Sequence, residues 1–228
     1  MVWLAATGGD ALPDGGRWAR RQRVQAGRDQ AAEQGEGGLQ IDQGPVHGRT
    51  ALLPIQQWFF DTDVPERHHW NQSVLLKPAR PLHADLLESA LRALTAQHDA
   101  LRLRFVEQDG VWSAAFAEVD PQAEVLWQAS VADAQELQQI SERAQCSLNL
   151  QDGPLLRGVL FTLADQSQRL LLIFHHLVVD GVSWRILLED LQNVLGQQAL
   201  PAKSSSTQAW AAQLQAYASS AALQHEQG

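Results

Sequence analysis

The feature that most constrains this chain is a pair of apolar segments joined by a short polar turn. The segments "PLLRGVLFTL" (154–163) and "RLLLIFHH" (169–176) flank the turn "ADQSQ" (164–168). Apolar runs of this length between turn residues predict two adjacent buried strands. The second run ends in two adjacent histidines, so titratable rings stand where the pattern predicts a buried strand.

Helix and strand signals alternate along the chain from about residue 52. The segment "NQSVLLKP" (71–78) predicts a strand, and "LRLRFVEQDGVWSAAF" (101–116) predicts a hairpin that turns at Asp109-Gly110. Further segments predict helices over 83–99, 131–148, 182–196 and 207–223. Helices interleaved with strands, some of them in hairpins, indicate an α/β fold with a mixed, partly antiparallel sheet covered by helices.

The first 48 residues differ in composition from the rest of the chain. They contain "GGDALPDGG" and a tract rich in Gly, Gln and Glu, with few large apolar side chains. Segments of this composition bury too little apolar surface to fold alone. We therefore predict a linker or disordered extension over 1–48 and a folded unit over 49–228.

Charge and cysteine content exclude several classes of partner and site. The formal net charge of −9 disfavours nucleic acids and anionic membranes, because both select basic surfaces. Cys146 is the single cysteine, which excludes an intrachain disulfide and a thiolate zinc site and favours a reducing compartment. No apolar run is long enough to cross a bilayer, and the start lacks a signal-peptide pattern. We expect a cytoplasmic protein that acts on small molecules or proteins.

The two histidines are expected to have different roles. Successive side chains of a strand point to opposite faces, so we predict that His175 packs into the fold while His176 faces a cleft. This divergence argues against a metal site, and no other His, Asp or Glu has a convincing ligand spacing. A neutral imidazole that titrates near neutral pH removes protons from amines or activated carbons, so His176 is a candidate base.

After the histidines the sequence predicts a strand-to-helix loop, a common place for catalytic groups. Asp180 and Gly181 predict a turn whose aspartate caps a helix that opens at Val182 or Ser183. Asp180 is also able to pair with an arginine and so hold the loop. We expect the backbone N–H groups at the start of the helix to face the cleft, where they would stabilise an oxyanion.

In this context "HHLVVDG" resembles the H-H-x-x-x-D-G motif of the condensation superfamily of nonribosomal peptide synthetases. Four further stretches resemble segments of that family in the same order: "LLPIQQWFF" (52–60), "HHWNQSVLL" (68–76), "HDALRLRF" (98–105) and "LPAKSSSTQAWAAQLQAYA" (200–218). The resemblance covers about residues 40–222 and implies a lobe with the chloramphenicol acetyltransferase fold.

The details are more similar to an epimerization domain than to a peptide-bond-forming domain. The strings "PIQQWFF", "HHWNQS" and "VSWRILLEDL" are typical of epimerization domains, and Gln97 stands where condensation domains usually carry Arg. The resemblance implies that His176 is catalytic and exchanges the Cα proton of an aminoacyl or peptidyl thioester, converting L to D. It implies no directly bound cofactor, because the phosphopantetheine arm of a peptidyl carrier protein supplies the acyl group.

The remaining candidate site residues have supporting roles by the same resemblance. Roles in shaping or holding the loop are implied for His175, Asp180, Gly181, Arg102 and Arg157. Arg102 or Arg157 would pair with Asp180, and the sequence does not choose between them. Ser183 and Trp184 are candidate substrate contacts, and helix capping by Ser183 and packing by Trp184 are the open alternatives.

The family's full domain has two lobes with the active site in a tunnel between them, and this sequence matches the first lobe. The resemblance implies that a glutamate of the second lobe acts as the opposing acid or base. Inversion needs proton removal on one face and delivery on the other, so one histidine is an incomplete catalyst. We expect the second lobe to be absent here, and the chain to be a weakly active or inactive part of a larger synthetase for an antibiotic or another secondary metabolite.

Three alternatives stay open from the sequence. A condensation lobe would join an acyl donor to an amino acceptor. A standalone acyltransferase of the same fold would need a second lobe or a homotrimer to complete its site, and a non-catalytic fragment would only dock a carrier protein. Racemised rather than elongated carrier-bound product separates epimerization from condensation.

Overall fold

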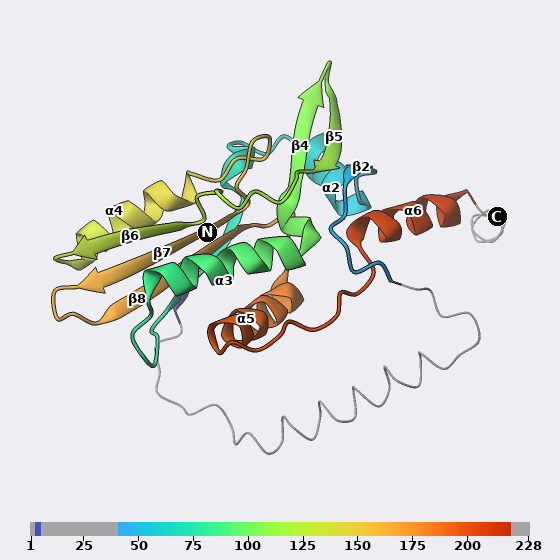
Figure 1. Cartoon of the computed structure of the whole chain (residues 1–228). Coiled ribbons are helices and arrows are strands. Elements are labelled where there is room, and N and C mark those ends of the chain that lie inside the picture. Colours follow the sequence, from blue (N-terminus) through green and yellow to red (C-terminus); the bar gives the residue numbers. More distant parts are fainter. Residues whose placement is uncertain (1–2, 6–40, 220–228) are drawn as a thin grey trace. The chain divides into compact units, whose positions relative to one another are not determined.

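The computed structural model of the chain describes residues 3–5 and 41–219 (Figure 1). Its helices are α2 (Pro54–Asp61), η1 (Arg67–His69), α3 (Ala84–Gln97), η2 (Asp99–Arg102), α4 (Ala134–Gln145), α5 (Gly181–Leu195) and α6 (Thr207–Ala218), where η marks a short 3-10 helix. Its strands are β1 (Trp3–Ala5), β2 (Gly48–Thr50), β3 (Asn71–Leu76), β4 (Leu103–Gln108), β5 (Val111–Phe116), β6 (Leu126–Val131), β7 (Leu156–Leu163) and β8 (Gln168–His175).

Five strands form the main sheet, in the order β1-β3-β8-β7-β6. β7 and β8 pair antiparallel as the predicted hairpin, from Leu156 opposite Phe174 to Thr162 opposite Gln168. β3 is antiparallel to β8, whereas β6 runs parallel to β7 and β1 runs parallel to β3. The sheet is mixed and partly antiparallel, which confirms the predicted fold class.

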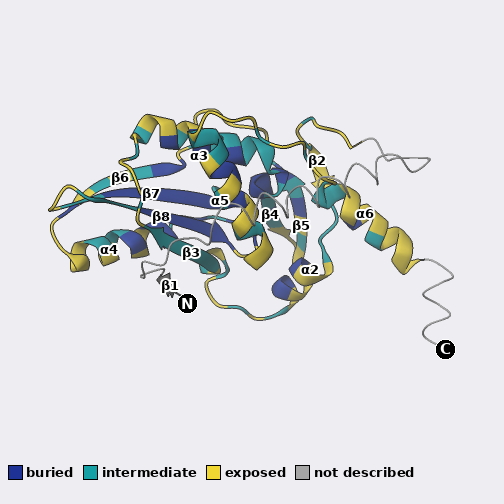
Figure 2. Cartoon of the chain, turned by 90° about the horizontal axis from the view of Figure 1, so that it is seen from below, coloured by how far each residue is buried: buried dark blue, intermediate teal, exposed yellow. Residues whose placement is uncertain are grey.

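Helices cover both faces of this sheet, with α3 and α5 on one face and α4 on the other (Figure 1). Leu170, Leu172 and Phe174 of β8 pack with α3 and α5, while Leu171 and Ile173 pack with α4. All five side chains are at most 3% exposed (Figure 2). Full burial of one such side chain stabilises a fold by about 1.5–3 kcal/mol, so this alternation strongly determines which face each residue of β8 reaches.

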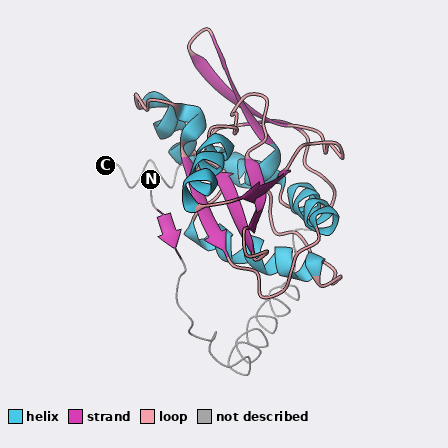
Figure 3. Ribbon diagram, turned by 90° about the vertical axis from the view of Figure 1, so that its left-hand side faces the viewer, coloured by secondary structure: helices cyan, strands magenta, loops and turns pink. Residues whose placement is uncertain are grey.

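A second sheet has the strand order β2-β5-β4 and is antiparallel. Its β4–β5 hairpin projects beyond the main sheet (Figure 3) and turns at Asp109 and Gly110. The φ values of 52° and 77° at these two residues lie in the left-handed region that a two-residue hairpin turn requires. The predicted hairpin is therefore confirmed. Phe59 and Phe60 of α2 pack with Phe105 of β4 in a separate core cluster.

The predicted helices over 83–99, 131–148 and 182–196 are confirmed as α3, α4 and α5, with ends shifted by one to three residues. α4 begins late because Asp133 is its N-cap and accepts the Glu136 backbone N–H. The strand predicted over 71–78 ends at Leu76, and β6 was not predicted. Local patterns therefore located most elements but not all of their ends.

Most of the predicted linker or disordered extension lies outside the described residues, because the structure describes nothing between residues 6 and 40. Residues 220–223 of the predicted last helix lie outside them as well. In the described part of 1–48, Trp3–Ala5 form β1 and Gly48 begins β2, and residues from Gln43 onward belong to the compact unit that holds both sheets. For the undescribed residues the linker stays a prediction.

Candidate functional site

Residues 176–180 form the loop that joins β8 to α5 and carries the histidine-aspartate motif. Asp180 is the N-cap of α5, and its Oδ1 atom accepts the backbone N–H groups of Ser183 at 2.8 Å and Val182 at 3.0 Å. The Ser183 hydroxyl donates to the same oxygen at 2.8 Å. These bonds, led by the Ser183 backbone N–H, favour the carboxylate and hold the pKa of Asp180 below its usual value. The predicted capping by Asp180 is confirmed.

His175 is the last residue of β8 and is 0% exposed. Its Nε2 atom lies 2.7 Å from the carbonyl oxygen of Arg67, and its Nδ1 atom accepts the Leu177 backbone N–H at 3.2 Å. A carbonyl oxygen only accepts, so Nε2 carries the proton. Burial disfavours the imidazolium and lowers the pKa of His175 to about 4. His175 is thus a neutral side chain directed into the fold, as strand alternation predicts.

His176 directly follows β8 and is exposed. Its backbone N–H donates to the Trp70 carbonyl at 2.8 Å, which fixes the start of the loop beside β3. Its Nδ1 atom lies 2.9 Å from the carbonyl oxygen of Val179. Because that oxygen only accepts, Nδ1 carries the proton and Nε2 keeps its lone pair. This is the form of imidazole that a general base requires.

Gln72 of β3, which the sequence interpretation did not single out, contacts His176. The Gln72 Nε2 atom lies 3.2 Å from His176 Nε2, and Gln72 Oε1 accepts the indole N–H of Trp184 at 2.8 Å. Trp184 also packs edge-on against Phe174, with ring centroids 4.9 Å apart. Its packing role is confirmed, and it is connected to His176 through Gln72. Gln72 lies in "HHWNQSVLL", but only the pairing of β3 with β8 brings it beside the loop.

Ser183 and Gly181 both have local roles at the start of α5. The Ser183 hydroxyl is engaged with Asp180, so the structure favours its helix-capping alternative. Gly181 is the first residue of α5, and its φ is not in the left-handed region that favours glycine. No heavy atom lies within 4 Å of the place that a Cβ would take at Gly181. Neither backbone conformation nor crowding in the described structure therefore requires a glycine there.

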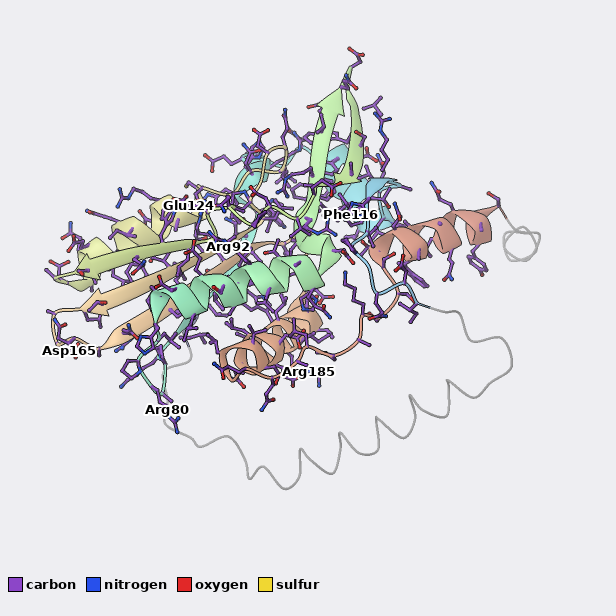
Figure 4. The ribbon with its side chains drawn as sticks, viewed as in Figure 1. Arg80, Arg92, Phe116, Glu124, Asp165 and Arg185 are labelled. Carbon is purple, nitrogen blue, oxygen red and sulfur yellow. The ribbon has the colours of Figure 1, made fainter. Side chains whose placement is uncertain are left out.

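The predicted pairing of Asp180 with Arg102 or Arg157 is wrong. Arg102 is 1% exposed and pairs with Asp99 at 2.5 Å. Arg157 is 4% exposed and pairs at 3.1 Å with Glu124, which precedes β6 and is labelled in Figure 4. A buried guanidinium group needs a partner close by, and each of these arginines has a carboxylate other than Asp180. Asp180 in turn is held by the N–H groups of α5.

The predicted oxyanion site at the start of α5 is not supported either. The N–H groups of Val182 and Ser183 donate to Asp180 Oδ1, and the Trp184 N–H donates to the Asp180 carbonyl at 3.2 Å. Each backbone N–H has one proton to donate, so these three donors are already engaged. The chemistry that the loop offers is therefore that of a neutral imidazole base.

Among residues 3–5 and 41–219, no three His, Cys, Asp or Glu side chains are grouped closely enough to hold a metal ion. In those ranges no helix is both long and apolar enough to span a bilayer.

Known proteins that resemble this chain belong to one family. The family model described as "Condensation domain" matches residues 46–228. One component of the linear gramicidin synthase of Brevibacillus parabrevis is 47% identical over 194 residues, which are 80% of this chain and 4% of that protein. Surfactin synthase subunit 1 of Bacillus subtilis (strain 168) is 42% identical over 200 residues, which are 83% of this chain and 6% of that protein. The chain thus spans a small part of the length of these relatives.

Two solved structures share the fold of the described residues. The epimerization domain from the third module of tyrocidine synthetase B is 37% identical, with a TM-score of 0.76, over 81% of this chain and 44% of that one. The first condensation domain of the calcium-dependent antibiotic synthetase is 26% identical, with a TM-score of 0.61, over 76% of this chain and 44% of that one. The chain spans less than half of either structure.

Proposed function

Because the chain belongs to the condensation-domain family of nonribosomal peptide synthetases, we propose that it carries the histidine half of an epimerization site. The proposed reaction exchanges the Cα proton of an aminoacyl or peptidyl thioester and converts L to D. The phosphopantetheine arm of a peptidyl carrier protein presents the thioester, so the proposed partner is a carrier protein and no cofactor binds the chain itself. The observation that carries the proposal is the exposed, neutral His176 with its proton on Nδ1.

The choice of epimerization over peptide-bond formation is supported by the comparison of the two solved structures. The epimerization domain has both the higher sequence identity and the higher TM-score. The strings "PIQQWFF", "HHWNQS" and "VSWRILLEDL" support the same choice. Peptide-bond formation is the second candidate, because the family model and the condensation-domain structure also match.

The proposed chemistry uses one lone pair on His176. Nε2 takes the Cα proton, and the electrons of the broken C–H bond delocalise onto the thioester oxygen to form an enolate. The ring then holds protons on both nitrogens, and it returns one of them to Cα to restore the C–H bond. In the condensation alternative, the same lone pair takes a proton from an acceptor amine that attacks the thioester carbonyl.

A single base exchanges a proton without inverting the centre. His176 removes and returns the proton on the same face of the enolate, and between these events the imidazolium exchanges its proton with water. Inversion needs a second acid on the opposite face, which we propose the family's second lobe supplies. The proposal therefore predicts that this chain alone exchanges the Cα proton faster than it inverts Cα.

Deuterium washout from an aminoacyl carrier thioester tests this proposal. We expect the chain to replace Cα deuterium by protium slowly but above the rate of the carrier alone, with most of the amino acid still L. His176→Ala should abolish the excess, because no other described group is assigned to proton removal. Mass spectrometry measures the washout, and chiral chromatography of the hydrolysed product measures inversion.

The outcomes separate the candidate functions. Washout equal in the wild-type chain and His176→Ala would refute the proposal. A dipeptide formed when a second aminoacyl carrier is supplied would establish the condensation alternative instead. Rapid inversion by the wild-type chain would show that no second lobe is needed, and it would refute the assignment of the opposing acid to that lobe.

A further inference from the structure

Three side chains form a hydrogen-bonded series from α5 through β3 to the loop. The Trp184 indole N–H donates to Gln72 Oε1 at 2.8 Å, and the Gln72 amide nitrogen lies 3.2 Å from His176 Nε2. On the other edge of the ring, His176 Nδ1 lies 2.9 Å from the Val179 carbonyl oxygen. Both nitrogens of His176 therefore have a partner within the chain.

The partners of Gln72 determine the orientation of its amide. An indole N–H can only donate, so the atom that faces Trp184 must be the amide oxygen. The reverse orientation would place the NH2 group against the indole N–H and lose this hydrogen bond. With its oxygen directed at Trp184, the amide directs its NH2 group at His176, and an NH2 group only donates.

A donor at Nε2 and an acceptor at Nδ1 select one form of the His176 ring. Nε2 must accept from Gln72 and therefore holds the lone pair, while Nδ1 must donate to Val179. Protonation of Nε2 would place two donors against each other and break the contact with Gln72. Hydrogen bonds to the neutral form disfavour the charged form, so both contacts together favour a neutral Nδ1–H ring.

We propose that Gln72, oriented by Trp184, is a positioning residue that keeps His176 as the neutral proton acceptor with Nε2 as its reactive atom. This inference rests on the proposed function and adds a direction to it: His176 begins a turnover by removing a proton rather than by donating one. Nε2 has a single lone pair, so the Gln72 amide gives way to the substrate proton as the reaction proceeds.

Other titratable groups around His176 are kept constant in the test. His175 at the end of β8 and Asp180 at the start of α5 interact electrostatically with His176, and no variant changes them. Gln128 provides a matched control, because it is exposed on β6, at the edge of the sheet away from β3. Trp184→Phe retains an aromatic ring to pack against Phe174 and removes only the indole N–H.

The test follows the ring nitrogen and proton NMR signals of His176 in the full chain as pH is varied, and His176→Ala assigns them. We expect the wild-type ring to be the Nδ1–H tautomer. Gln72→Glu places an acceptor at Nε2 and should raise the titration midpoint by at least about one pH unit. Trp184→Phe frees the amide to turn its oxygen toward Nε2 and should raise the midpoint by less. Gln128→Glu makes the same change of charge and should leave it unchanged.

An Nε2–H tautomer in the wild-type chain would overturn the proposal. So would a Trp184→Phe chain that titrates like the wild type, or a Gln72→Glu shift no larger than that of Gln128→Glu. The NMR readout needs no turnover, so it is independent of the proposed function. The expected titrations without His176-dependent washout would refute epimerization and keep the positioning role, whereas His176-dependent washout with unchanged titrations would do the reverse.

Discussion

His175 and His176 are neighbours at the end of β8, yet the buried and the exposed side of the chain hold their rings in opposite tautomers. His175 lies beside Phe59, donates from Nε2 to a main-chain carbonyl and has its pKa lowered to about 4 by burial. His176 is exposed and donates from Nδ1, which leaves its lone pair on Nε2. The comparison shows that the acceptor at one ring edge determines which nitrogen remains basic.

Replacing each histidine by alanine should separate the two sides most strongly. His175→Ala removes a fully buried ring and leaves the Arg67 carbonyl without its donor, so we expect the free energy of unfolding to fall by about 3–4 kcal/mol. His176→Ala removes an exposed ring and should change that free energy by less than about 0.5 kcal/mol. Urea denaturation measures both, and equal losses would contradict the assignment of the two sides.

The pH dependence of stability should follow the buried histidine. The pKa of His175 is about 4 in the fold against 6.5 for an ordinary histidine, so the unfolded chain takes up this proton first as pH falls. The contribution of His175 is complete above pH 6.5 and is lost progressively toward pH 4, a loss of about 3 kcal/mol. Free energies of unfolding measured in urea at several pH values report this loss.

His175→Gln serves as the control for this pH dependence, because its amide offers a donor and an acceptor but does not titrate. Its stability should fall by about 3 kcal/mol less than that of the wild type over the same interval. His176→Ala should retain the wild-type dependence. Parallel pH profiles for the wild type and His175→Gln would show that the buried ring is not responsible.

Removal of the Asp180 cap should have the smallest effect of the three. Asp180→Ala leaves the first N–H groups of α5 without an acceptor, so we expect the free energy of unfolding to fall by about 1 kcal/mol. Asp180→Asn, which also caps well, should cost less. Asp133→Ala removes the matching cap of α4 and should give a similar loss without changing the His176 ring signals. No loss in Asp180→Ala would contradict the capping role.

Several features of the site follow from short stretches of sequence. The alternation in "RLLLIFHH" predicts which histidine faces inward, and Asp109-Gly110 predicts the hairpin turn. Asp180 predicts the helix cap. In each case the backbone geometry of a few consecutive residues leaves little choice. β6 was missed because only Leu126 and Val131, at its two ends, are buried, and it is placed by parallel pairing with β7.

The predicted arginine partners failed for a related reason. Arg157 has Glu124 within reach, 33 residues away along the chain, and Arg102 has Asp99 beside it within a 3-10 helix that no pattern indicated. Asp180 needed neither arginine, because α5 supplies its donors. A sequence contains many carboxylates for each arginine, and only packing brings one of them into contact.

By itself the sequence determined the strand-loop-helix unit, its family motif and the opposite directions of His175 and His176, because backbone periodicity acts over a few residues. Only the tertiary structure decided which groups meet His176. Gln72 is separated from His176 by 104 positions and from Trp184 by 112. Antiparallel pairing of β3 with β8 and the packing of Trp184 against Phe174 bring them together. Such contacts depend on the order of strands in the sheet, which no local pattern specifies.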